Sequence, residues 1–160
     1  MTATARTNTD PVTTSNGVLD MLRRQRSLYT KLESVASRQR SLITSDEPSS
    51  LLALLADRQK LSVELRHIAM ELEPVRREWD RVRRGFSSDQ RDEAETLLGE
   101  IRQRLGRIIE GDEQDSKLLS ARKQAAAAAL RESHTTSEAL AAYRAPVGGT
   151  ERLDCLNEAT

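Results

Sequence analysis

The amino-acid sequence predicts an all-α fold, an elongated antiparallel helical hairpin followed by a long third helix. Three observations lead to this prediction. Aromatic residues make up only 2% of the 160 residues and charged residues 31%, which favours a thin core of Leu, Ile, Val and Ala. No stretch alternates β-branched or aromatic residues with polar ones, as strands do. Apolar residues recur instead at alternating spacings of three and four, the heptad pattern of a three-helix bundle with coiled-coil-like packing.

The chain is expected to begin with a disordered tail and a first helix. Residues 1–16 are rich in Thr and contain almost nothing to bury, so we expect them to be disordered. The helix predicted over residues 17–44 has an apolar stripe wide enough to pack against more than one helix, because Leu28, Val35 and Leu42 broaden it. Its heptad positions are Leu22, Gln25, Tyr29, Leu32, Ala36, Gln39 and Ile43.

The second helix, predicted over residues 49–84, carries the longest apolar seam. A short polar turn containing Pro48 precedes it, which makes the first two helices antiparallel neighbours. Pro74 removes a backbone hydrogen bond at a cost of up to roughly 3 kcal/mol. Because the apolar pattern continues beyond Pro74, we expect one kinked helix rather than two. The seam positions are Leu51, Leu54, Arg58, Leu61, Leu65, Ile68, Leu72, Val75, Trp79 and Val82.

The third helix is predicted over residues 88–143, with Ser87, Ser88 and Asp89 as candidate caps. Its first half offers an apolar face for docking, formed by Ala94, Leu97, Leu98, Ile101, Leu105, Ile108 and Ile109. Its last part is rich in Ala and only weakly apolar, so it is either marginally ordered or completed by a partner. Residues 17–145 are therefore expected to form one domain and residues 146–160 a flexible tail.

The charge pattern indicates contacts within the chain rather than with a polyanion. Lys plus Arg and Asp plus Glu both number 25, so the net charge gives no general attraction to nucleic acid or membrane. Residues 17–44 carry six basic and two acidic groups, and residues 85–116 carry four basic and nine acidic groups. These two segments are expected to attract each other. The Arg clusters at 23–26, 38–40 and 76–84 lack aromatic stacking partners and are interpreted as solvated helix faces.

No catalytic or metal-ligating pattern is found in the sequence. His67 and His134 are isolated and expected near the surface, and Trp79 is expected in the core. The chain is therefore predicted to be no enzyme and to need no cofactor or metal. Cys155, the single cysteine, allows no internal disulfide, which fits a reducing, cytoplasmic setting. Neither a signal peptide nor a membrane-spanning segment is expected.

Four residues depart from the pattern around them. Arg58, Asp112 and Asp115 are polar at seam positions, where such residues often fix the register of helices at some cost in stability. Tyr143 ends the third helix just before a Pro-Val-Gly-Gly break, where burial gives little reason for an aromatic residue. It is interpreted either as an anchor for another protein or as a staple for the helix end.

In these features the chain resembles the FlgN family of flagellar type III export chaperones over residues 18 to about 149. The similarity lies in the repeated Leu and Gln of the first helix and in the run from Leu51 to Leu65. It continues with Asp112-x-x-Asp115-x-x-Leu118-Leu119 and with the close Tyr143-Arg144-Ala145-Pro146-Val147-Gly148. The family more often has Asn where this chain has Asp112 and Asp115.

The resemblance implies a cytoplasmic, non-enzymatic chaperone. Such proteins bind the C-terminal amphipathic helices of hook-filament junction (hook-associated) proteins, prevent their premature assembly and deliver them to the export gate, a membrane protein. Tyr143 would contact the gate. The free protein would be a monomer or weak dimer, with no nucleic acid partner and no membrane insertion. The residues implied to bind the client protein are Leu118, Leu119, Arg122, Ala126, Leu130 and Leu140.

Three other functions remain open from the sequence. The long seams could serve a structural coiled-coil scaffold that self-associates, which would be a stable dimer or larger assembly. A FliT-like filament-cap chaperone would use a similar helix for a different client. A nucleic-acid-associated regulator would rely on the Arg clusters and would show DNA affinity at modest salt.

Overall fold

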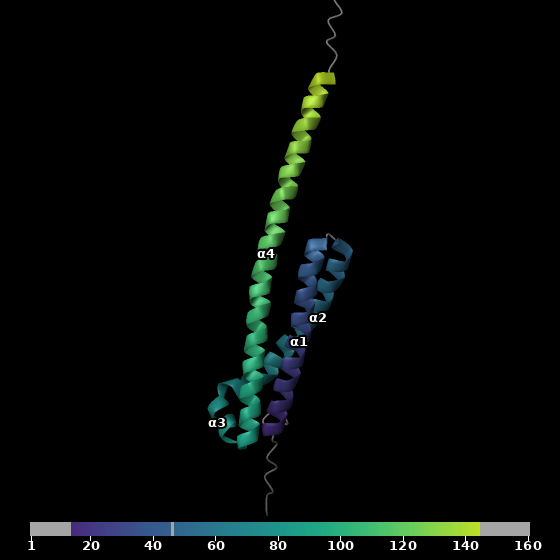
Figure 1. The fold of residues 1–160 in the computed structure, drawn as a ribbon. Helices are drawn as coiled ribbons and strands as arrows, with labels where there is room; N and C mark the ends of the chain where they lie inside the picture. Colours follow the sequence, from purple (N-terminus) through teal and green to yellow (C-terminus); the bar gives the residue numbers. More distant parts are fainter. Residues whose placement is uncertain (1–13, 46, 145–160) are drawn as a thin grey trace, which may run out of the picture. The chain divides into compact units, whose positions relative to one another are not determined.

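The computed structural model describes residues 14–45 and 47–144, which are helical apart from residues 14, 47, 78 and 85–87, with no strand among them. The all-α prediction is therefore confirmed. The helices are α1 (Ser15–Ser45), α2 (Pro48–Arg77), α3 (Trp79–Arg84) and α4 (Ser88–Arg144), as Figure 1 shows. The chain divides into two units, with the boundary between residues 119 and 120. The tails predicted for 1–16 and 146–160, with Cys155, lie largely outside the described residues.

Helix α1 begins two residues earlier than predicted because Thr14 caps it. The Thr14 hydroxyl accepts a hydrogen bond from the Gly17 backbone N–H at 3.1 Å. An N-cap side chain of this kind satisfies one of the free N–H groups of the first turn. Ser15 and Asn16, predicted as part of the disordered tail, therefore belong to α1.

The heptad seams of the first two helices are covered as the sequence predicts. All ten seam positions from Leu51 to Val82 are buried or half-buried, and so are the seven positions of α1 and the three residues that widen its stripe. Residues of α1 share an apolar cluster with residues of α2 whose numbers fall as those of α1 rise: Leu22 is in the cluster of Val75, and Leu32 is in the cluster of Leu65. This order is that of antiparallel neighbours.

The single kinked helix predicted over residues 49–84 is wrong, because the structure has two helices separated at Glu78. Glu78 has φ −109° and ψ 28°, outside the helical region, while its N–H still bonds the Pro74 carbonyl at 3.3 Å. Pro74 itself lies inside α2. The break lets Trp79 pack edge-on against Phe86, with ring centroids 6.0 Å apart.

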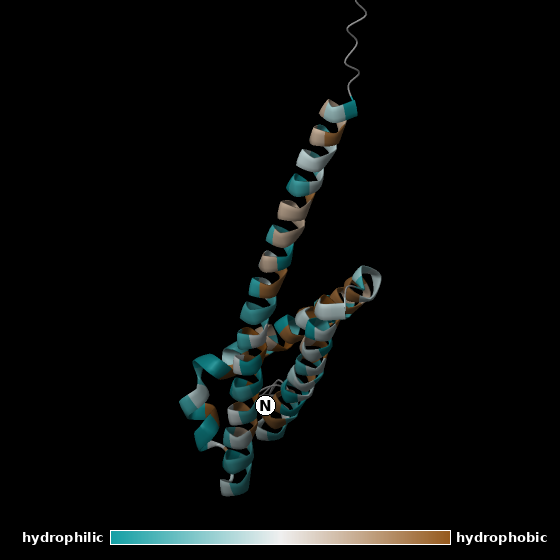
Figure 2. Cartoon of the chain, turned by 45° about the horizontal axis from the view of Figure 1, so that its top comes forward, coloured by the Kyte–Doolittle hydropathy of each residue, from teal (hydrophilic) through white to brown (hydrophobic). Residues whose placement is uncertain are grey.

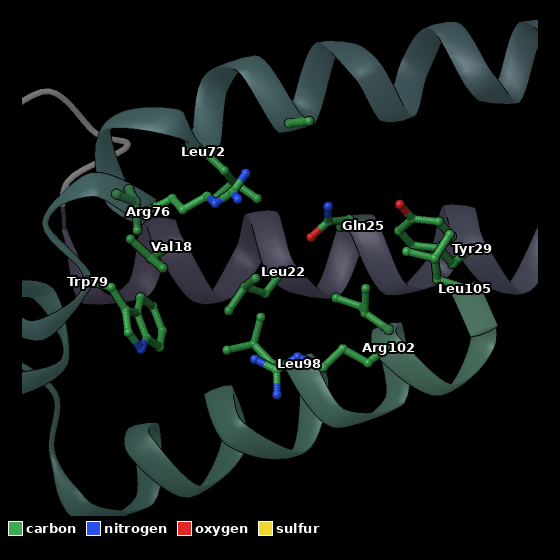
Figure 3. A pocket seen from close by; sticks show the side chains of 13 residues that line it. Val18, Leu22, Gln25, Tyr29, Leu72, Arg76, Trp79, Leu98, Arg102 and Leu105 are labelled. Atoms are coloured by element: carbon green, nitrogen blue, oxygen red, sulfur yellow. The ribbon is translucent and has the colours of Figure 1, made fainter.

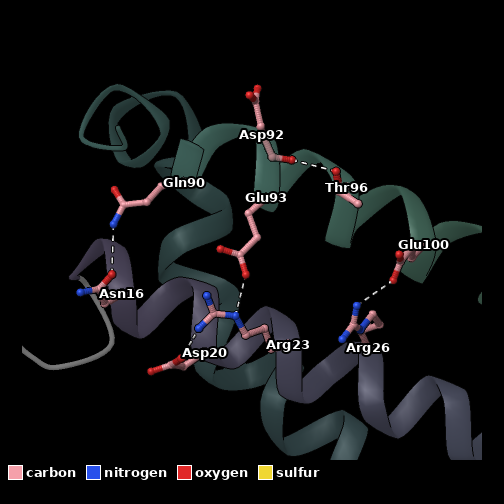
Figure 4. Close-up of polar contacts among 9 residues, drawn as sticks. All are labelled: Asn16, Asp20, Arg23, Arg26, Gln90, Asp92, Glu93, Thr96 and Glu100. Carbon is pink, nitrogen blue, oxygen red and sulfur yellow. Dashed lines mark hydrogen bonds and ion pairs between the residues drawn. The ribbon is translucent and has the colours of Figure 1, made fainter. Parts of the chain in front are cut away.

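Helix α4 begins with a reciprocal cap. The Ser87 hydroxyl accepts from the Gln90 N–H at 3.2 Å, and the Gln90 side chain accepts from the Ser87 N–H at 2.9 Å. This is a capping box, formed by one of the predicted cap residues. Gln90 also donates to Asn16 at the start of α1, 3.0 Å away (Figure 4).

Two apolar clusters form the core of the first unit. One gathers Val18, Leu19, Leu22, Val75, Phe86, Ala94, Leu97 and Ile101, and the other Leu28, Leu32, Leu65, Ile68 and Ile108. Each cluster takes residues from α1, α2 and α4, so burial of apolar surface holds these three helices together. Leu105 and Ile109, predicted to dock with the rest of their face, remain exposed.

Ion pairs fix the alignment of α1 with the first part of α4. Arg23 pairs with Glu93 at 2.6 Å and Arg26 with Glu100 at 3.1 Å (Figure 4). Farther along, Glu33 pairs with both Arg104 and Arg107, at 2.6 Å each. The residue numbers of the paired side chains increase together along both helices, so α1 and α4 run parallel in this unit. The predicted attraction between these segments is present, with the signs reversed at Glu33, and Arg23 and Arg26 are paired rather than merely solvated.

Candidate functional site

The residues that the sequence singles out for client binding lie mostly in the second unit, on the last part of α4. Residues 120–144 are helical, and every side chain among them is exposed except that of Ala127, which is half-buried. Leu130 is 72% exposed, Leu140 51% and Tyr143 90%. Figure 2 shows white and brown ribbon alternating with teal along this segment, as its mixed composition requires.

The candidate client-binding residues of this segment share one face of the helix. At about 100° per residue, Arg122, Ala126, Leu130 and Leu140 fall within an arc of about 80°, and Tyr143 lies about 60° outside it. The other residues of this arc are Ser133, Ser137 and Arg144, and Glu132 and Glu138 fall outside it. We call this arc of residues 122–144 the Leu130 stripe. A face with apolar side chains and no carboxylate can bind the apolar side of another helix, particularly one flanked by acidic residues.

The two remaining candidates, Leu118 and Leu119, belong to the first unit. Leu118 is half-buried, whereas Leu119 is 44% exposed. Of the two, Leu119 thus offers more surface to a partner in this structure.

Tyr143 lies in the last turn of α4, which ends at Arg144. At 90% exposure its ring packs against almost nothing, which does not fit a staple for the helix end. A large exposed aromatic side chain at a helix end is suited to anchoring a protein partner, because it buries much area with little loss of side-chain freedom.

The polar seam residues come together in a network between α1, α2 and α4. The Arg58 guanidinium donates to the Gln39 side-chain carbonyl at 2.7 Å and pairs with the Asp112 carboxylate. The Gln39 amide donates to Asp115 at 3.2 Å, and Arg40 Nε donates to Asp115 at 3.0 Å. Asp115 is only 3% exposed, so these hydrogen bonds offset the cost of burying its carboxylate.

This network is best explained by the alignment of helices rather than by chemistry. Its members hydrogen-bond one another across three helices, although Asp112 Oδ1 is buried without a hydrogen-bond partner. A shift of one helical turn would separate the bonded polar groups from their partners. The sequence identified Arg58, Asp112 and Asp115 as polar seam residues, but not Arg40, which was assigned to a solvated cluster. Gln39 could have indicated the network from the sequence, since it too is a polar residue at a heptad position.

The two histidines and Glu33 each contact other ionisable side chains. His67 and His134 are exposed and each pairs with a Glu one turn later, at 3.1 Å to Glu71 and 3.4 Å to Glu138. No group of three or more metal-ligating residues occurs in the part of the chain that the structure describes. Desolvation raises the pKa of Glu33, but hydrogen bonds from Arg107 and Arg104 outweigh it, and the pKa lies below its ordinary value. Glu33 is thus a fixed charge.

Comparison of the chain with models of protein families, with curated protein sequences and with solved structures finds no match. Among the described residues, no helix has the length and apolar character needed to cross a membrane.

Proposed function

We propose that this chain is a cytoplasmic, non-enzymatic flagellar export chaperone that binds the C-terminal amphipathic helix of a hook-associated protein. The observation that carries the proposal is the Leu130 stripe, a helical face that exposes Leu130 and Leu140 and carries no carboxylate. An amphipathic helix laid along this face would bury Leu130 and Leu140 together with its own apolar residues. The FlgN-like order of motifs along the sequence supplies the class of client.

The first unit would serve as the scaffold of this chaperone. In the proposal it is a three-helix bundle, formed by the α1–α2 hairpin and the first part of α4. Burial of both apolar clusters and the polar network would keep this scaffold folded while the client exchanges. Binding a client helix would protect it from premature assembly, since the same apolar face is needed for polymerisation.

Tyr143 would carry a separate role at the export gate, a membrane protein. Its exposure and its position in the last helical turn support this assignment. Delivery and client binding would then depend on different side chains of the same segment. Tyr143→Ala should therefore abolish export while client affinity stays within about twofold.

The decisive test is co-expression with each hook-associated protein and with the filament cap, followed by size-exclusion chromatography and calorimetry. We expect a one-to-one complex with a hook-associated protein that is lost when Leu130 and Leu140 are both replaced by Glu. A complex with the filament cap alone would instead indicate a FliT-like chaperone.

A self-associating scaffold is the competing function, because an exposed apolar stripe can also pair with a second copy. Analytical ultracentrifugation separates the two. The chaperone is expected to be a monomer or weak dimer when free, whereas a scaffold would be a stable dimer or larger assembly at micromolar concentration. A stable assembly that resists dilution would contradict the proposed function.

A further inference from the structure

The first unit contains an apolar groove that the proposed client site does not use. It has a volume of about 440 Å³ and lies between α2 and α4, with α1 as its floor (Figure 3). Val18, Leu22 and Tyr29 contribute from α1, Leu72 from α2 and Leu98 and Leu105 from α4. Trp79 lies near Val18 at one end of the groove, and Tyr29 lies near Leu105 at the other end.

The groove presents apolar surface that the fold leaves uncovered. Leu105 is 36% exposed although it belongs to the docking face of α4, and Leu72, Leu98, Trp79 and Tyr29 are only half-buried. Apolar side chains that converge on a concave surface are typical of a docking site. Desolvation raises the pKa of Tyr29, which agrees with an apolar setting at that end.

The charges around the groove are of one sign. Arg76 lines it from α2 and Arg102 from α4, on opposite walls, with Gln25 as a further polar residue on the floor. None of the lining residues is acidic. Arg76 is 85% exposed and has only a 4.0 Å ion pair with Glu73, and Arg102 has no ion pair in the described part of the chain. Both guanidinium groups are therefore available to carboxylates of an occupant.

The length of the groove suits a helix. From Val18 to Tyr29 the floor spans eleven steps of an α-helix, about 16 Å or three turns. Three turns can hold apolar residues at i, i+3, i+4 and i+7 of a helix lying along the groove, which is the common mode of helix-in-groove recognition.

We propose that this groove docks an amphipathic helix of another protein that carries carboxylates on both sides of its apolar face. The apolar face would cover Leu22, Leu72 and Leu98, and the carboxylates would pair with Arg76 and Arg102. The Leu130 stripe of a second copy does not fit, because it carries Arg122 and Arg144 and would place Arg against Arg. The groove is distinct from the Leu130 stripe, so its role does not depend on the proposed export function.

Trp79 allows the groove to be tested directly, because it is the only Trp of the chain. The full-length protein is titrated with a capped 14-residue helical peptide that has Leu at i, i+3, i+4, i+7 and Glu on both flanks. Matched peptides carry Lys in place of Glu, or the same residues in scrambled order. We expect a saturable change in Trp79 emission, with the Glu peptide bound at least tenfold more tightly than the Lys peptide and no saturable change with the scrambled peptide.

Charge reversal provides the second arm of the test. Arg76→Glu and Arg102→Glu should leave the circular dichroism spectrum unchanged, because both positions are exposed. The double variant should prefer the Lys peptide. Arg122→Glu with Arg144→Glu, outside the groove, should leave the response unchanged. No saturable response, equal affinity for all three peptides, or an unchanged preference in the double variant would overturn the proposal. Two further results would overturn the proposal. A change of Trp79 emission with protein concentration in the absence of peptide would indicate that a second copy occupies the groove. A response to dodecanoate alone would indicate that the groove binds a small amphiphile.

Discussion

The Arg58 guanidinium and the Asp112 carboxylate form an ion pair between α2 and α4, at two positions where the heptad seam is otherwise apolar. Arg58 is only 19% exposed and also donates to Gln39 of α1, so one side chain connects three helices. Its removal would leave the Gln39 carbonyl and the Asp112 carboxylate without these donors.

Replacing Arg58 is expected to destabilise the first unit. Arg58→Met should lower the free energy of unfolding by about 1–3 kcal/mol, the usual cost of removing a charged hydrogen-bond partner from a partly buried site. Urea denaturation followed by circular dichroism measures it. Arg77→Met on the same helix is the control, because the Arg77–Glu73 pair is 76% and 45% exposed and should contribute less than about 0.5 kcal/mol. Equal effects of the two substitutions would contradict the role given to Arg58.

The pairing of Glu33 predicts a pH dependence of stability. Since its pKa is lowered in the folded chain, the stabilisation is present above the unfolded pKa of about 4.3 and is lost as the pH falls through the folded value. Unfolding free energy should therefore decrease below about pH 5, and Glu33→Gln should flatten this decrease. Urea titrations at several pH values measure it. If the unfolding free energy of Glu33→Gln falls with pH as steeply as that of the wild type, other carboxylates dominate the pH dependence of stability.

Two glycines of α4 should respond differently to substitution by Ala. A Cβ at Gly106 would meet nothing within 4 Å, so Gly106→Ala should stabilise the helix by about 0.5–1 kcal/mol. A Cβ at Gly111 would lie 3.1 Å from Arg40 Nη2, which donates to the Gly111 carbonyl at 3.2 Å. Gly111→Ala should therefore gain less than Gly106→Ala. Thermal melting compares them, and a larger gain at Gly111 would mean that the Arg40 contact contributes nothing.

Burial separates the core of the first unit from the Leu130 stripe. Ile68 is 1% exposed, so Ile68→Ala should cost about 2–5 kcal/mol, whereas Leu130→Ala, at 72% exposure, should change stability by less than about 0.5 kcal/mol. Chemical denaturation provides both values. A large loss with Leu130→Ala would show that the stripe is already packed in the free protein and is not waiting for a partner.

Heptad spacing predicted the buried faces of α1 and α2, because an apolar stripe at 3.5-residue spacing can be recognised in the local sequence. It did not predict that Leu105 and Ile109 of α4 stay exposed, because that depends on which helix covers them. All ten seam positions of the second helix are covered, including Arg58. The break at Glu78 was missed because Trp79 and Val82 continue the seam, while the turn is favoured by the contact of Trp79 with Phe86, a residue beyond the predicted helix. The heptad pattern gives no information on a contact with a residue beyond the end of the helix.

The two candidate sites differ in how far they could be predicted from local sequence. The residues of the Leu130 stripe could be named from the sequence because the family resemblance implies them, and helical spacing places them on one face. The groove joins Tyr29, Trp79 and Leu105 from separate helices, and each of these positions looks like ordinary core in isolation. Only the arrangement of α1, α2 and α4 leaves space between them.

The measurement that tests the central claim most directly is calorimetry of the full-length chain with the C-terminal helix peptide of a hook-associated protein. Leu130→Glu should weaken binding at least tenfold, because it places a carboxylate within the apolar face. Ala128→Glu, two residues away and about 160° around the helix, is the matched control and should bind as the wild type does. Equal losses in both variants, or no binding by the wild type, would contradict the assignment of the Leu130 stripe as the client site.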